Sequence, residues 1–586
     1  MEKINMKING HEVSVPAGST ILEAAQQMGI TIPTLCYMKK INEIGACRIC
    51  VVEVKGAKTL VTACVYPVSE GMEVWTNSQK VLDARRTTLE LILSNHNRSC
   101  LSCVRSGTCE LQSLCRQYGV DNENAYEGEK TPTEVDTSTD YLIRDNSKCI
   151  LCRRCVAVCR TTQGIGVIGA VNRGFRTEIS TAYDMDLSKT SCVGCGQCVA
   201  VCPVGALREK DQIQEVLAAI NDPEKTVLVQ TAPAVRAALG ESFGYPIGTD
   251  VQGKMAAALR RIGFDRVFDT NFGADLTIME ESNEFISRLK NGGKLPMITS
   301  CSPGWVKFCE HYYPEMTENL SSCKSPHQMF GAVAKSYWAE KMGVDKKNIV
   351  VVSIMPCTAK KFEIHRPDEA ANGVPDVDYV LTTRELARLI DRSGINFAAL
   401  PDEEFDQPLG SGTGAAVIFG ATGGVMEAAL RTAVHTLTGK DAPSVDFQEV
   451  RGVEGIKEAA YTVDGVGQIK VAVASGLANA RELLDRIQRG EADYQFIEIM
   501  GCPGGCVNGG GQPHVSGDIR NFTDIRAKRA QVLYALDQGN ALRCSYENPD
   551  VKELYQNYLG EPGSEKAHHL LHTSYVKRTV NRVFEK

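Results

Sequence analysis

The pattern of apolar and polar positions at the N-terminus predicts a hairpin followed by a short helix. Apolar and polar residues alternate over residues 4–8 and again over 12–15, and Asn9-Gly10 between them suits a tight turn. Thr20 and Glu23 then have the spacing of a helix capping box. Together these signals predict a small β-rich domain over residues 1–78.

The second half of the chain has a different pattern, in which short apolar runs rich in β-branched residues alternate with helix-like segments. The runs cover residues 226–230, 296–300, 349–354, 379–381 and 495–500. Such runs indicate buried strands in an α/β arrangement. Cys301, Cys357 and Cys502 follow three of these strands closely. Loops at the carboxyl ends of strands are where α/β folds build their sites.

Changes in this pattern divide the chain into several expected domains. The fold class that they indicate is multidomain α+β and α/β, with small domains before a large α/β domain at 226–523. The other parts are a helical region, a polar and acidic linker, a region with two copies of one cysteine pattern, and a C-terminal helical wrap. Their expected bounds are 79–120, 121–140, 141–210 and 524–586.

Composition places the chain among large globular proteins. Of its 586 residues, 43% are hydrophobic and 23% charged, and 64 basic against 71 acidic residues give a net charge of −7. This balance favours neither a nucleic acid nor a membrane surface as a partner. No apolar run approaches the roughly 18 residues that span a bilayer, and the start lacks the apolar core of a secretory signal. We therefore expect a cytoplasmic protein.

The 23 cysteines indicate metal ligation rather than disulfides, because the cytosol keeps thiols reduced. Two copies of the Cys-x2-Cys-x2-Cys-x3-Cys run match bacterial ferredoxins, in which three cysteines hold one 4Fe-4S cluster and the fourth reaches the other. We assign Cys149, Cys152, Cys155 and Cys202 to one cluster, and Cys192, Cys195, Cys198 and Cys159 to its neighbour. Paired zinc knuckles would not need a repeated run that ends in Cys-Pro.

Two looser ligand sets precede this run. Cys36, Cys47, Cys50 and Cys64 follow the hairpin and helix, as in plant-type ferredoxins with a 2Fe-2S centre, although the spacing alone also allows structural zinc. The second set is His96, Cys100, Cys103 and Cys109. Taken alone it suits either zinc or a 4Fe-4S cluster, and a lone histidine in a helix is more often packed or solvated.

In this order, the four sets resemble the front half of iron-only (FeFe) hydrogenases and of the large iron-sulfur subunit of respiratory complex I. Both families use one histidine and three cysteines for a 4Fe-4S cluster, so the resemblance makes His96 a strong candidate ligand. Three further segments separate the families: 299–305 (TSCSPGW), 355–363 (MPCTAKKFE) and 498–513 (EIMGCPGGCVNGGGQP). They are similar to the three signatures of the hydrogenase catalytic domain, and the similarity extends over nearly all of residues 226–580.

The resemblance implies an enzyme that interconverts hydrogen with protons and electrons at an H-cluster. In this family the H-cluster is a 4Fe-4S cube joined through one thiolate to a two-iron unit that carries carbon monoxide, cyanide and a dithiolate. By motif position Cys357, Cys502 and Cys506 bind the cube, and Cys506 is the shared thiolate. A dry pocket lined by soft ligands suits such a cluster. Oxygen sensitivity and anaerobic hydrogen metabolism are further implications.

Several other residues near the signatures receive roles from the same resemblance. Lys360 matches a donor to a cyanide nitrogen, where a surface lysine is the ordinary alternative. Met355 and Met500 suit a soft pocket lining, although simple core packing explains them equally well. The glycines at 509–511 would let backbone approach the cluster closely.

Hydrogen chemistry also moves protons, so titratable groups must connect the two-iron unit to water. By resemblance the relay consists of Cys301, Glu281, Ser321, Glu284 and Arg288. The spacing of its two glutamates and its arginine places them on one helix face, which an ordinary solvated face of ion pairs would also explain. Four cysteines receive no role and are expected to be buried thiols: Cys115, Cys309, Cys323 and Cys544.

The first signature departs from the family pattern. The family has two adjacent cysteines, of which the first relays protons and the second binds the cube, whereas this chain has Ser302 in the second position. Either Cys301 is the relay, and the Ser302 oxygen is the fourth ligand or that iron is unusually coordinated, or a shift of the loop lets Cys301 bind iron. Thiolate matches iron better, which favours the shift. The otherwise complete relay favours Cys301 as its first member, and we adopt that interpretation.

The accessory clusters imply an electron path to ferredoxin or to flavin- and NAD(P)-binding partner subunits, as in catalytic subunits of NAD(P)-linked hydrogenases. The chain itself has no Gly-rich nucleotide fingerprint. Two other functions are possible. A hydrogenase-related assembly factor would lack the N-terminal cluster sets and the complete second and third signatures. A sensory hydrogenase would carry a signalling domain and alter the relay cysteine. The direction of the reaction and the acceptor are not fixed by the sequence.

Overall fold

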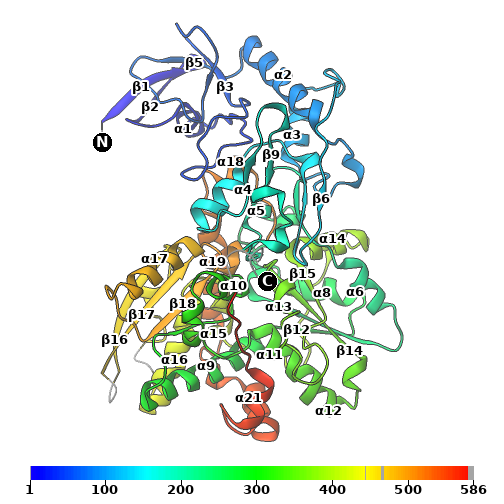
Figure 1. Cartoon of the computed structure of the whole chain (residues 1–586), viewed down its shortest axis with the longest axis vertical. Coiled ribbons are helices and arrows are strands. Elements are labelled where there is room, and N and C mark those ends of the chain that lie inside the picture. The colour runs from blue at the N-terminus through cyan, green and yellow to red at the C-terminus, as the bar shows by residue number, and fades with distance from the viewer. Residues whose placement is uncertain (1, 442–443, 464–466, 579–586) are drawn as a thin grey trace.

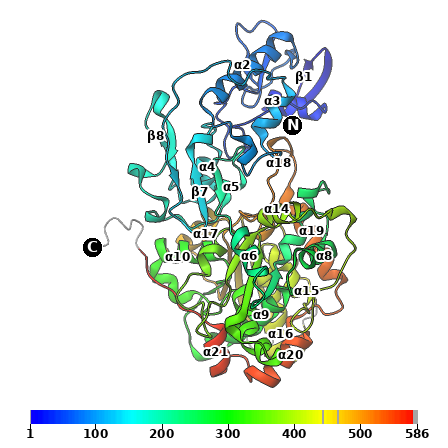
Figure 2. The ribbon, with the colours of Figure 1, turned by 90° about the vertical axis from the view of Figure 1, so that its right-hand side faces the viewer.

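The computed structural model describes residues 2–441, 444–463 and 467–578, so residues 579–586 of the expected C-terminal wrap lie outside it. The cysteine-rich N-terminal parts form the upper portion of the molecule and the α/β part forms the lower one (Figure 1). Figure 2 shows the same division from the side. In the part of the chain described, no helix is both long and apolar enough to cross a membrane.

A five-stranded sheet forms the N-terminal part, with the strand order β2-β1-β5-β3-β4. The strands β1 (Lys3–Ile8) and β2 (His11–Pro16) pair antiparallel, and Asn9 and Gly10 between them have φ values of 51° and 86°. Positive φ at both positions suits a tight hairpin turn. The helix α1 (Ile21–Gln27) begins with the capping box of Thr20 and Glu23. The predicted hairpin and helix are confirmed. The other strands are β3 (Val51–Val54), β4 (Val61–Thr62) and β5 (Glu73–Trp75).

Two helices follow, and then the region with the repeated cysteine run (residues 141–210), which we call the cluster fold. The helices α2 (Gln79–Asn95) and α3 (Glu110–Gln117) lie in the predicted helical region. Beyond them, two short helices, α4 (Arg154–Ala157) and α5 (Gln197–Ala200), each begin after a residue with positive φ, Arg153 and Gly196. This shared geometry is the structural counterpart of the sequence repeat. The strands here are β6 (Val135–Asp136), β7 (Leu142–Asp145), β8 (Gly169–Val171), β9 (Glu178–Ser180) and β10 (Leu207–Glu209).

The α/β part contains two four-stranded sheets. The first has the order β12-β11-β14-β15 with all strands parallel, and the second has the order β13-β18-β17-β16. The strands of the first are β11 (Thr226–Thr231), β12 (Arg266–Asp269), β14 (Ile349–Met355) and β15 (Tyr379–Thr382). Those of the second are β13 (Met297–Ile298), β16 (Ile456–Val463), β17 (Gly467–Ser475) and β18 (Phe496–Met500).

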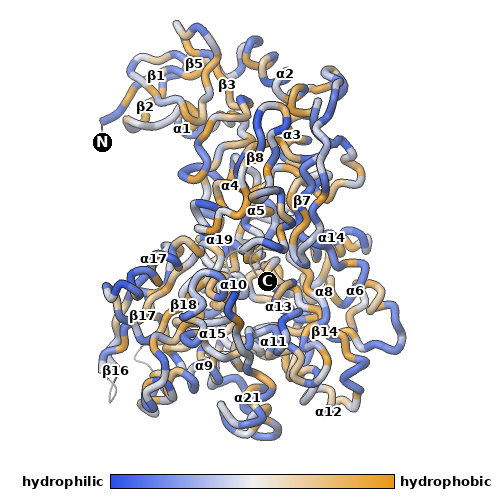
Figure 3. The backbone as a smooth tube through the Cα atoms, viewed as in Figure 1, coloured by the Kyte–Doolittle hydropathy of each residue, from blue (hydrophilic) through white to orange (hydrophobic). Residues whose placement is uncertain are grey.

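All five strands predicted in this part are present, and three others were missed. The missed strands are β12, which begins with an exposed arginine, and the antiparallel pair β16 and β17. β16 alternates buried and exposed residues instead of forming a continuous apolar run. Hydrophobic residues concentrate along central strands such as β14 and β18 (Figure 3). The apolar-run criterion therefore found the strands that are apolar along most of their length, at the centre or the edge of a sheet, and overlooked those that contain exposed positions.

One long helix packs against the cores of both sheets. The helix α9 (Asn271–Asn291) contributes Phe272 and Leu276 to the core around the first sheet. It contributes Ile278 and Phe285 to the core around the second. The other helices of this part include α6 (Ile213–Ile220), α8 (Gln252–Ile262), α10 (Pro303–Tyr312), α11 (Pro326–Val333), α13 (Lys360–Glu363), α14 (Thr383–Arg392), α16 (Gly424–Thr438) and α17 (Leu477–Gln488).

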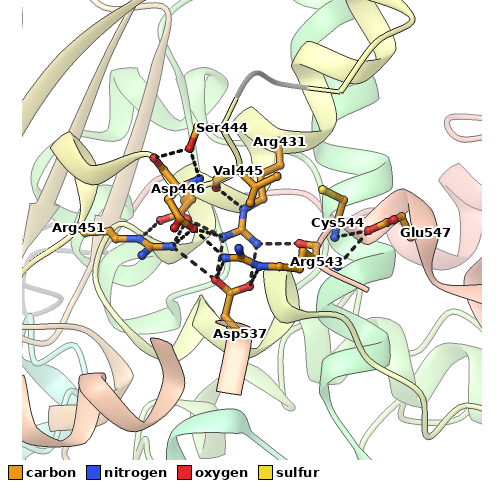
Figure 4. A network of polar contacts seen from close by, with 10 residues as sticks. Arg431, Ser444, Val445, Asp446, Arg451, Asp537, Arg543, Cys544 and Glu547 are labelled. Atoms are coloured by element: carbon orange, nitrogen blue, oxygen red, sulfur yellow. Dashed lines mark hydrogen bonds and ion pairs between the residues drawn. The ribbon is translucent and has the colours of Figure 1, made fainter. Parts of the chain in front are cut away.

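The C-terminal segment wraps this part with α19 (Ile525–Gly539), α20 (Pro549–Leu554) and α21 (Glu565–Leu571). A buried ion-pair network ties α19 to α16 (Figure 4). Its centre is Asp537, whose carboxylate lies 2.9 Å from Nη2 of Arg431 and 2.6 Å from Nη2 of Arg543. Removing one partner from a buried network of this kind leaves uncompensated charge, so the network fixes the position of the wrap.

Candidate functional site

The eight cysteines of the repeated run surround two cavities. One is lined by Cys149, Cys152, Cys155 and Cys202. The other is lined by Cys159, Cys192, Cys195 and Cys198. Each cavity thus combines three cysteines of one run with the last cysteine of the other, which is the crossed arrangement that the sequence predicts. Burial raises the pKa values of Cys155 and Cys198 well above the ordinary thiol value. Four inward thiols with no disulfide fit a 4Fe-4S cluster.

The four N-terminal cysteines also come together. Sγ of Cys50 lies 3.3 Å from Sγ of Cys64. Hydrogen bonding with Cys47 raises the pKa of Cys36, and hydrogen bonding with Cys36 lowers the pKa of Cys47 to about 6. Two pairs of close, unoxidised thiols in one loop region fit a cluster with sulfur ligands.

His96 lies at the end of α2 and is 8% exposed. Its Nδ1 has no hydrogen-bond partner, and burial lowers the pKa of the imidazole to about 4. The ring is therefore neutral at ordinary pH and offers a free nitrogen to a metal. Of the cysteines in the same set, Cys100 is exposed whereas Cys103 and Cys109 are half-buried. This donor set fits a cluster close to the surface.

A further cavity lies where the carboxyl ends of the two sheets meet. Cys357 follows β14 of the first sheet, whereas Cys301 follows β13 and Cys502 and Cys506 follow β18 of the second. All four line the cavity, together with Lys360, Met355 and Met500. The remaining lining is mainly apolar and includes Ala232, Pro233, Ala274, Pro326 and Phe419. Sulfur donors in a dry cavity fit a soft metal cluster.

Burial makes neutral thiols of the cysteines in this cavity. It raises the pKa of Cys502 well above the ordinary thiol value and that of Cys506 to about 12, and the neighbouring thiols add to both shifts. It also raises the pKa of Cys357, against the effect of Lys360. A bound metal cation stabilises the thiolate form of such buried cysteines.

Lys360 is held at the cavity wall by residues that sequence reasoning did not single out. Its Nζ donates to Oε2 of Glu363 at 2.7 Å and to the carbonyl of Cys301 at 3.2 Å. The same Glu363 oxygen lies 2.5 Å from Nε2 of His327. Burial opposes ionisation of Glu363, but Lys360 and His327 outweigh it and lower its pKa to about 2. Glu363 closes the second signature, whereas no sequence signal pointed to His327.

Ser302 and its neighbour Cys301 lie in different surroundings. The Ser302 hydroxyl accepts a hydrogen bond from the backbone N–H of Gly501 at 3.1 Å, next to Cys502. Burial raises the pKa of Cys301 well above its usual value; Glu281 and Cys506 add to the rise, and Lys360 opposes it. The serine oxygen therefore lies beside the third signature, and the thiol lies near the first carboxyl of the expected relay.

Four of the five expected relay residues form a connected chain, from Glu281 to Arg288. Burial, followed by repulsion from Glu284, raises the pKa of Glu281 to about 8, and a hydrogen bond with Ser321 opposes the shift. The Ser321 hydroxyl donates to Oε2 of Glu284 at 3.1 Å. Nη2 of Arg288 lies 2.5 Å from Oε1 of Glu284. The polar groups thus run along α9 from the cavity toward its half-exposed end.

The glycines of the third signature lie against backbone of neighbouring loops, and Gly509 also lines the cavity. A Cβ on Gly509 would lie 2.1 Å from the carbonyl oxygen of Pro356, and one on Gly510 would lie 2.1 Å from that of Cys195. The expectation that they admit a close approach is correct, but their neighbours are the second signature and the cluster fold. A side chain there would separate these loops.

The cluster fold and the α/β part meet at this point. Thr358 donates through Oγ1 to the carbonyl of Gly194 at 2.6 Å, and Gln197 donates through Nε2 to the carbonyl of Asn508 at 2.8 Å. Cys195 and Cys502 lie close enough for each to affect the other's surroundings. The two sulfur-lined cavities are therefore neighbours across this contact.

The four unassigned cysteines differ in exposure. Cys309, Cys323 and Cys544 are buried as expected, but Cys115 is half-buried. It lies on the amphipathic helix α3, so its pattern did not distinguish the core face from the boundary.

Comparisons with known proteins agree with this arrangement. The family "Iron only hydrogenase large subunit, C-terminal domain" matches residues 225–510, and "Iron hydrogenase small subunit" matches 523–578. A 2Fe-2S iron-sulfur cluster binding domain matches 1–79, an NADH-ubiquinone oxidoreductase-G iron-sulfur binding region matches 85–124, and a 4Fe-4S dicluster domain matches 148–206.

Two curated relatives resemble nearly the whole chain. NADP-reducing hydrogenase subunit HndD of Solidesulfovibrio fructosivorans is 54% identical, and the alignment covers 99% of this chain and 100% of that protein. Iron hydrogenase 1 of Clostridium pasteurianum is 43% identical over 97% of this chain and 99% of that protein. A solved apo FeFe-hydrogenase from Chlamydomonas reinhardtii is 46% identical with a TM-score of 0.56, and covers 63% of this chain and 99% of that one.

Proposed function

The chain belongs to the iron-only hydrogenase family, and from that premise we propose which of its residues interconvert hydrogen with protons and electrons. The enzyme holds 2Fe-2S and 4Fe-4S clusters and an H-cluster. When bound, the H-cluster supplies the iron centre at which hydrogen is cleaved or formed. The observation that carries the assignment is the dry cavity that gathers Cys301, Cys357, Cys502, Cys506 and Lys360 from all three signatures.

In this proposal Cys357, Cys502 and Cys506 would hold the H-cluster, and Cys506 would supply the thiolate on the side of the two-iron unit. Lys360 would donate to a cyanide nitrogen of the bound cluster from the cavity wall, where its ion pair with Glu363 orients the ammonium. Met355 and Met500 help to exclude water. The proposal also keeps the domain bounds expected from the sequence, from the first domain at 1–78 to the C-terminal wrap that begins at 524.

Cys301 is the first member of the proton relay in this proposal, and the Ser302 oxygen would be the fourth ligand of the cube. The location of the Ser302 oxygen beside Gly501 supports this reading, as does the proximity of Cys301 to Glu281. At pH 7 Glu281 holds a proton, because its pKa is about 8. Glu281 can therefore donate its proton to Cys301 and regain a proton through Ser321 and Glu284. Arg288 forms an ion pair with the Glu284 carboxylate.

Electrons pass between the H-cluster cavity and the surface through the accessory cluster sites, in the order of the contacts between these sites. The ligand set that contains Cys195 adjoins Cys502 of the H-cluster cavity. The ligand set that contains Cys152 adjoins both outer sets, namely the 2Fe-2S cysteines and the set with His96. Asn42 donates through Nδ2 to the carbonyls of Cys36 at 2.7 Å and Cys152 at 3.1 Å. On the other side, Arg105 donates to the carbonyl of Cys202 at 2.6 Å beside the His96 set. The Cys149 set is thus the proposed branch point toward the 2Fe-2S and His-ligated clusters.

The proposed partners dock at these two outer clusters. Leu101, between Cys100 and Cys103, is fully exposed, and Ile44, Val65 and Tyr66 are exposed beside the 2Fe-2S ligands. Apolar side chains at such positions suit contact with another protein. One relative is named as a subunit of an NADP-reducing hydrogenase, which supports a flavin- and NAD(P)-binding partner subunit, with ferredoxin as the other acceptor. Native mass analysis of the complex from its source would identify the partner.

The activity is tested with the protein after assembly of its clusters. It should evolve hydrogen from a reduced low-potential dye, contain about 20 iron atoms per chain from the assigned cluster types, and lose activity in oxygen. Cys506→Ala should abolish hydrogen evolution with any electron donor. A fully loaded protein with the two-iron unit that cannot turn over hydrogen would refute the proposal.

A further inference from the structure

A thiol, an imidazole and a carboxylate meet beside the outer end of the proton relay. Donor atoms of Glu284, Cys323 and His572 all lie within 4.8 Å of one another. Cys323 is 1% exposed, and the side chains of His572 and Glu284 are 7% and 15% exposed. None of the four accessory clusters or the H-cluster uses Cys323 or His572. The group therefore shares only Glu284, a member of the expected relay, with the sites already described.

Backbone contacts from three parts of the chain fix these side chains. Cys323 and His572 face each other in an isolated antiparallel bridge. Two backbone hydrogen bonds flank it, from Lys324 to Leu571 and from Thr573 to Ser322, each at 2.8 Å. Side chains directly opposite each other in such a bridge lie on the same face. Glu284 approaches from α9, so the cluster joins that helix, the Ser321 loop and the C-terminal wrap.

The donor geometry suits a small divalent ion. Sγ of Cys323 lies 3.8 Å from Oε2 of Glu284. A tetrahedral zinc ion with bonds of about 2.3 Å to sulfur and about 2.0 Å to oxygen separates these donors by about 3.5 Å. Arg288 binds the other carboxylate oxygen, Oε1, whereas Oε2 faces the thiol and also accepts from the Ser321 hydroxyl at 3.1 Å and from the backbone N–H of Ser322 at 3.0 Å.

A further carboxylate orients the imidazole. Oε2 of Glu280, one helical turn before Glu284, lies 3.1 Å from Nε2 of His572. A carboxylate on one ring nitrogen is the usual support for a histidine that binds metal through the other. The other nitrogen, Nδ1, now lies 2.8 Å from the hydroxyl of Ser322, a partner that can rotate away.

Another group of acidic residues shows the opposite situation. Glu427, Asp446 and Asp537 also converge, but the guanidinium groups of Arg431, Arg451 and Arg543 fill the space between them (Figure 4). Positive charge already neutralises those carboxylates. The cluster around Cys323 has a single arginine, which binds only the outer oxygen of Glu284.

We propose that Glu284, Cys323 and His572 form a binding site for a zinc-class divalent ion. Binding replaces the thiol proton of Cys323, which leaves to solvent, by a sulfur–metal bond. Because the ion also takes Oε2 of Glu284, the oxygen that accepts from Ser321, it closes the proton relay and inhibits turnover. This inhibition rests on the relay of the proposed function, whereas the site itself does not.

The test uses the cluster-loaded enzyme under anaerobic conditions, with zinc chloride as the probe. X-ray absorption at the zinc edge should show one bound zinc with one sulfur neighbour and nitrogen or oxygen neighbours. Cys323→Ala should remove the sulfur neighbour, and His572→Ala should weaken zinc binding at least about tenfold. Cys309→Ala removes another buried thiol outside the cluster and serves as the matched control, which should bind zinc like the unmodified enzyme.

Hydrogen evolution in the same titration separates the site from the relay. Each rate is compared with the zinc-free rate of the same variant, and the iron content must stay constant. The unmodified enzyme should lose activity as zinc binds and regain it with a chelator. Zinc bound through sulfur without loss of turnover would retain the site but refute the role of Glu284 as a relay. Zinc bound without sulfur, or equally by Cys323→Ala and His572→Ala, would overturn the site.

Discussion

The Ser302 hydroxyl accepts a hydrogen bond from the backbone N–H of Gly501, so the serine that replaces an expected cysteine is fixed beside the third signature. Its neighbour Cys301 lies near Glu281 instead. We therefore expect substitutions at Cys301 and Ser302 to have different effects, on proton transfer and on cluster ligation. Cys301→Ala should lower hydrogen evolution about 10²- to 10⁴-fold through loss of proton transfer, with the iron content unchanged.

Ser302→Cys is the companion variant. It should supply a thiolate to the cube and alter the spectrum of the reduced H-cluster while activity persists, since thiolate matches iron better than a hydroxyl does. Iron analysis and electron paramagnetic resonance check both variants. Loss of cluster iron in Cys301→Ala, together with an unaltered spectrum in Ser302→Cys, would instead make Cys301 the ligand.

The pH dependence of hydrogen evolution should follow Glu281. Burial raises the pKa of this carboxyl to about 8, so the folded enzyme holds the proton at pH 7 and loses it as pH rises through 8. The ionised form cannot donate, and the rate should therefore fall with a midpoint near pH 8. Glu281→Gln cannot exchange protons and should lose about 10²- to 10⁴-fold in rate at every pH.

Steady-state rates from pH 6 to pH 9 with a reduced dye measure this profile. Glu318→Gln, a change at an exposed carboxyl near the outer end of the relay, is the control and should keep the profile of the unmodified enzyme. An unchanged midpoint in Glu281→Gln would remove Glu281 from the relay.

Most ligand positions could be predicted because ligation fixes spacing along the chain. The repeated run around Cys149 and Cys192 specifies both cavities, since three sulfurs per cluster come from one short loop. His327 gave no such signal, because its contact with Glu363 joins α11 to α13 through tertiary packing. The cluster of Glu284, Cys323 and His572 was missed for the same reason, as its members come from three distant segments.

The fold was predictable to a similar degree. Apolar runs identified β11 and β14, which are buried on both faces, but not β16, which has alternating exposure. The glycines of the third signature were noticed, yet their neighbours were not. The sequence indicates that position 510 has no room for a side chain, and only the structure shows that the backbone of Cys195 is the neighbour that takes this room.

Gly510→Ala should therefore disturb the contact between the cluster fold and the α/β part. The added Cβ would lie 2.1 Å from the carbonyl oxygen of Cys195, so one loop must move. Overpacking of this kind costs about 1–3 kcal/mol, and we expect a lower melting temperature with slower electron transfer between the neighbouring clusters. Gly128→Ala is the matched control, because no heavy atom lies within 4 Å of its added Cβ. Equal melting temperatures for the two variants would show that the loops can separate without cost.

His96→Ala should separate two kinds of activity. His96 is the proposed fourth ligand of an outer cluster whose Cys100 is exposed, and dyes can reach other centres, so dye-linked hydrogen evolution should remain largely intact. Electron transfer to the protein partner should be impaired, because the exposed Leu101 region is one of the two proposed docking sites. Parallel assays with dye and with the partner protein measure the ratio. Burial keeps the imidazole of His96 neutral above about pH 4. In His96→Cys an anionic thiolate would take the place of this neutral ligand, so the cluster should form with an altered reduction potential. Equal loss of both activities in His96→Ala would place the cluster on the obligatory route or give it a structural role.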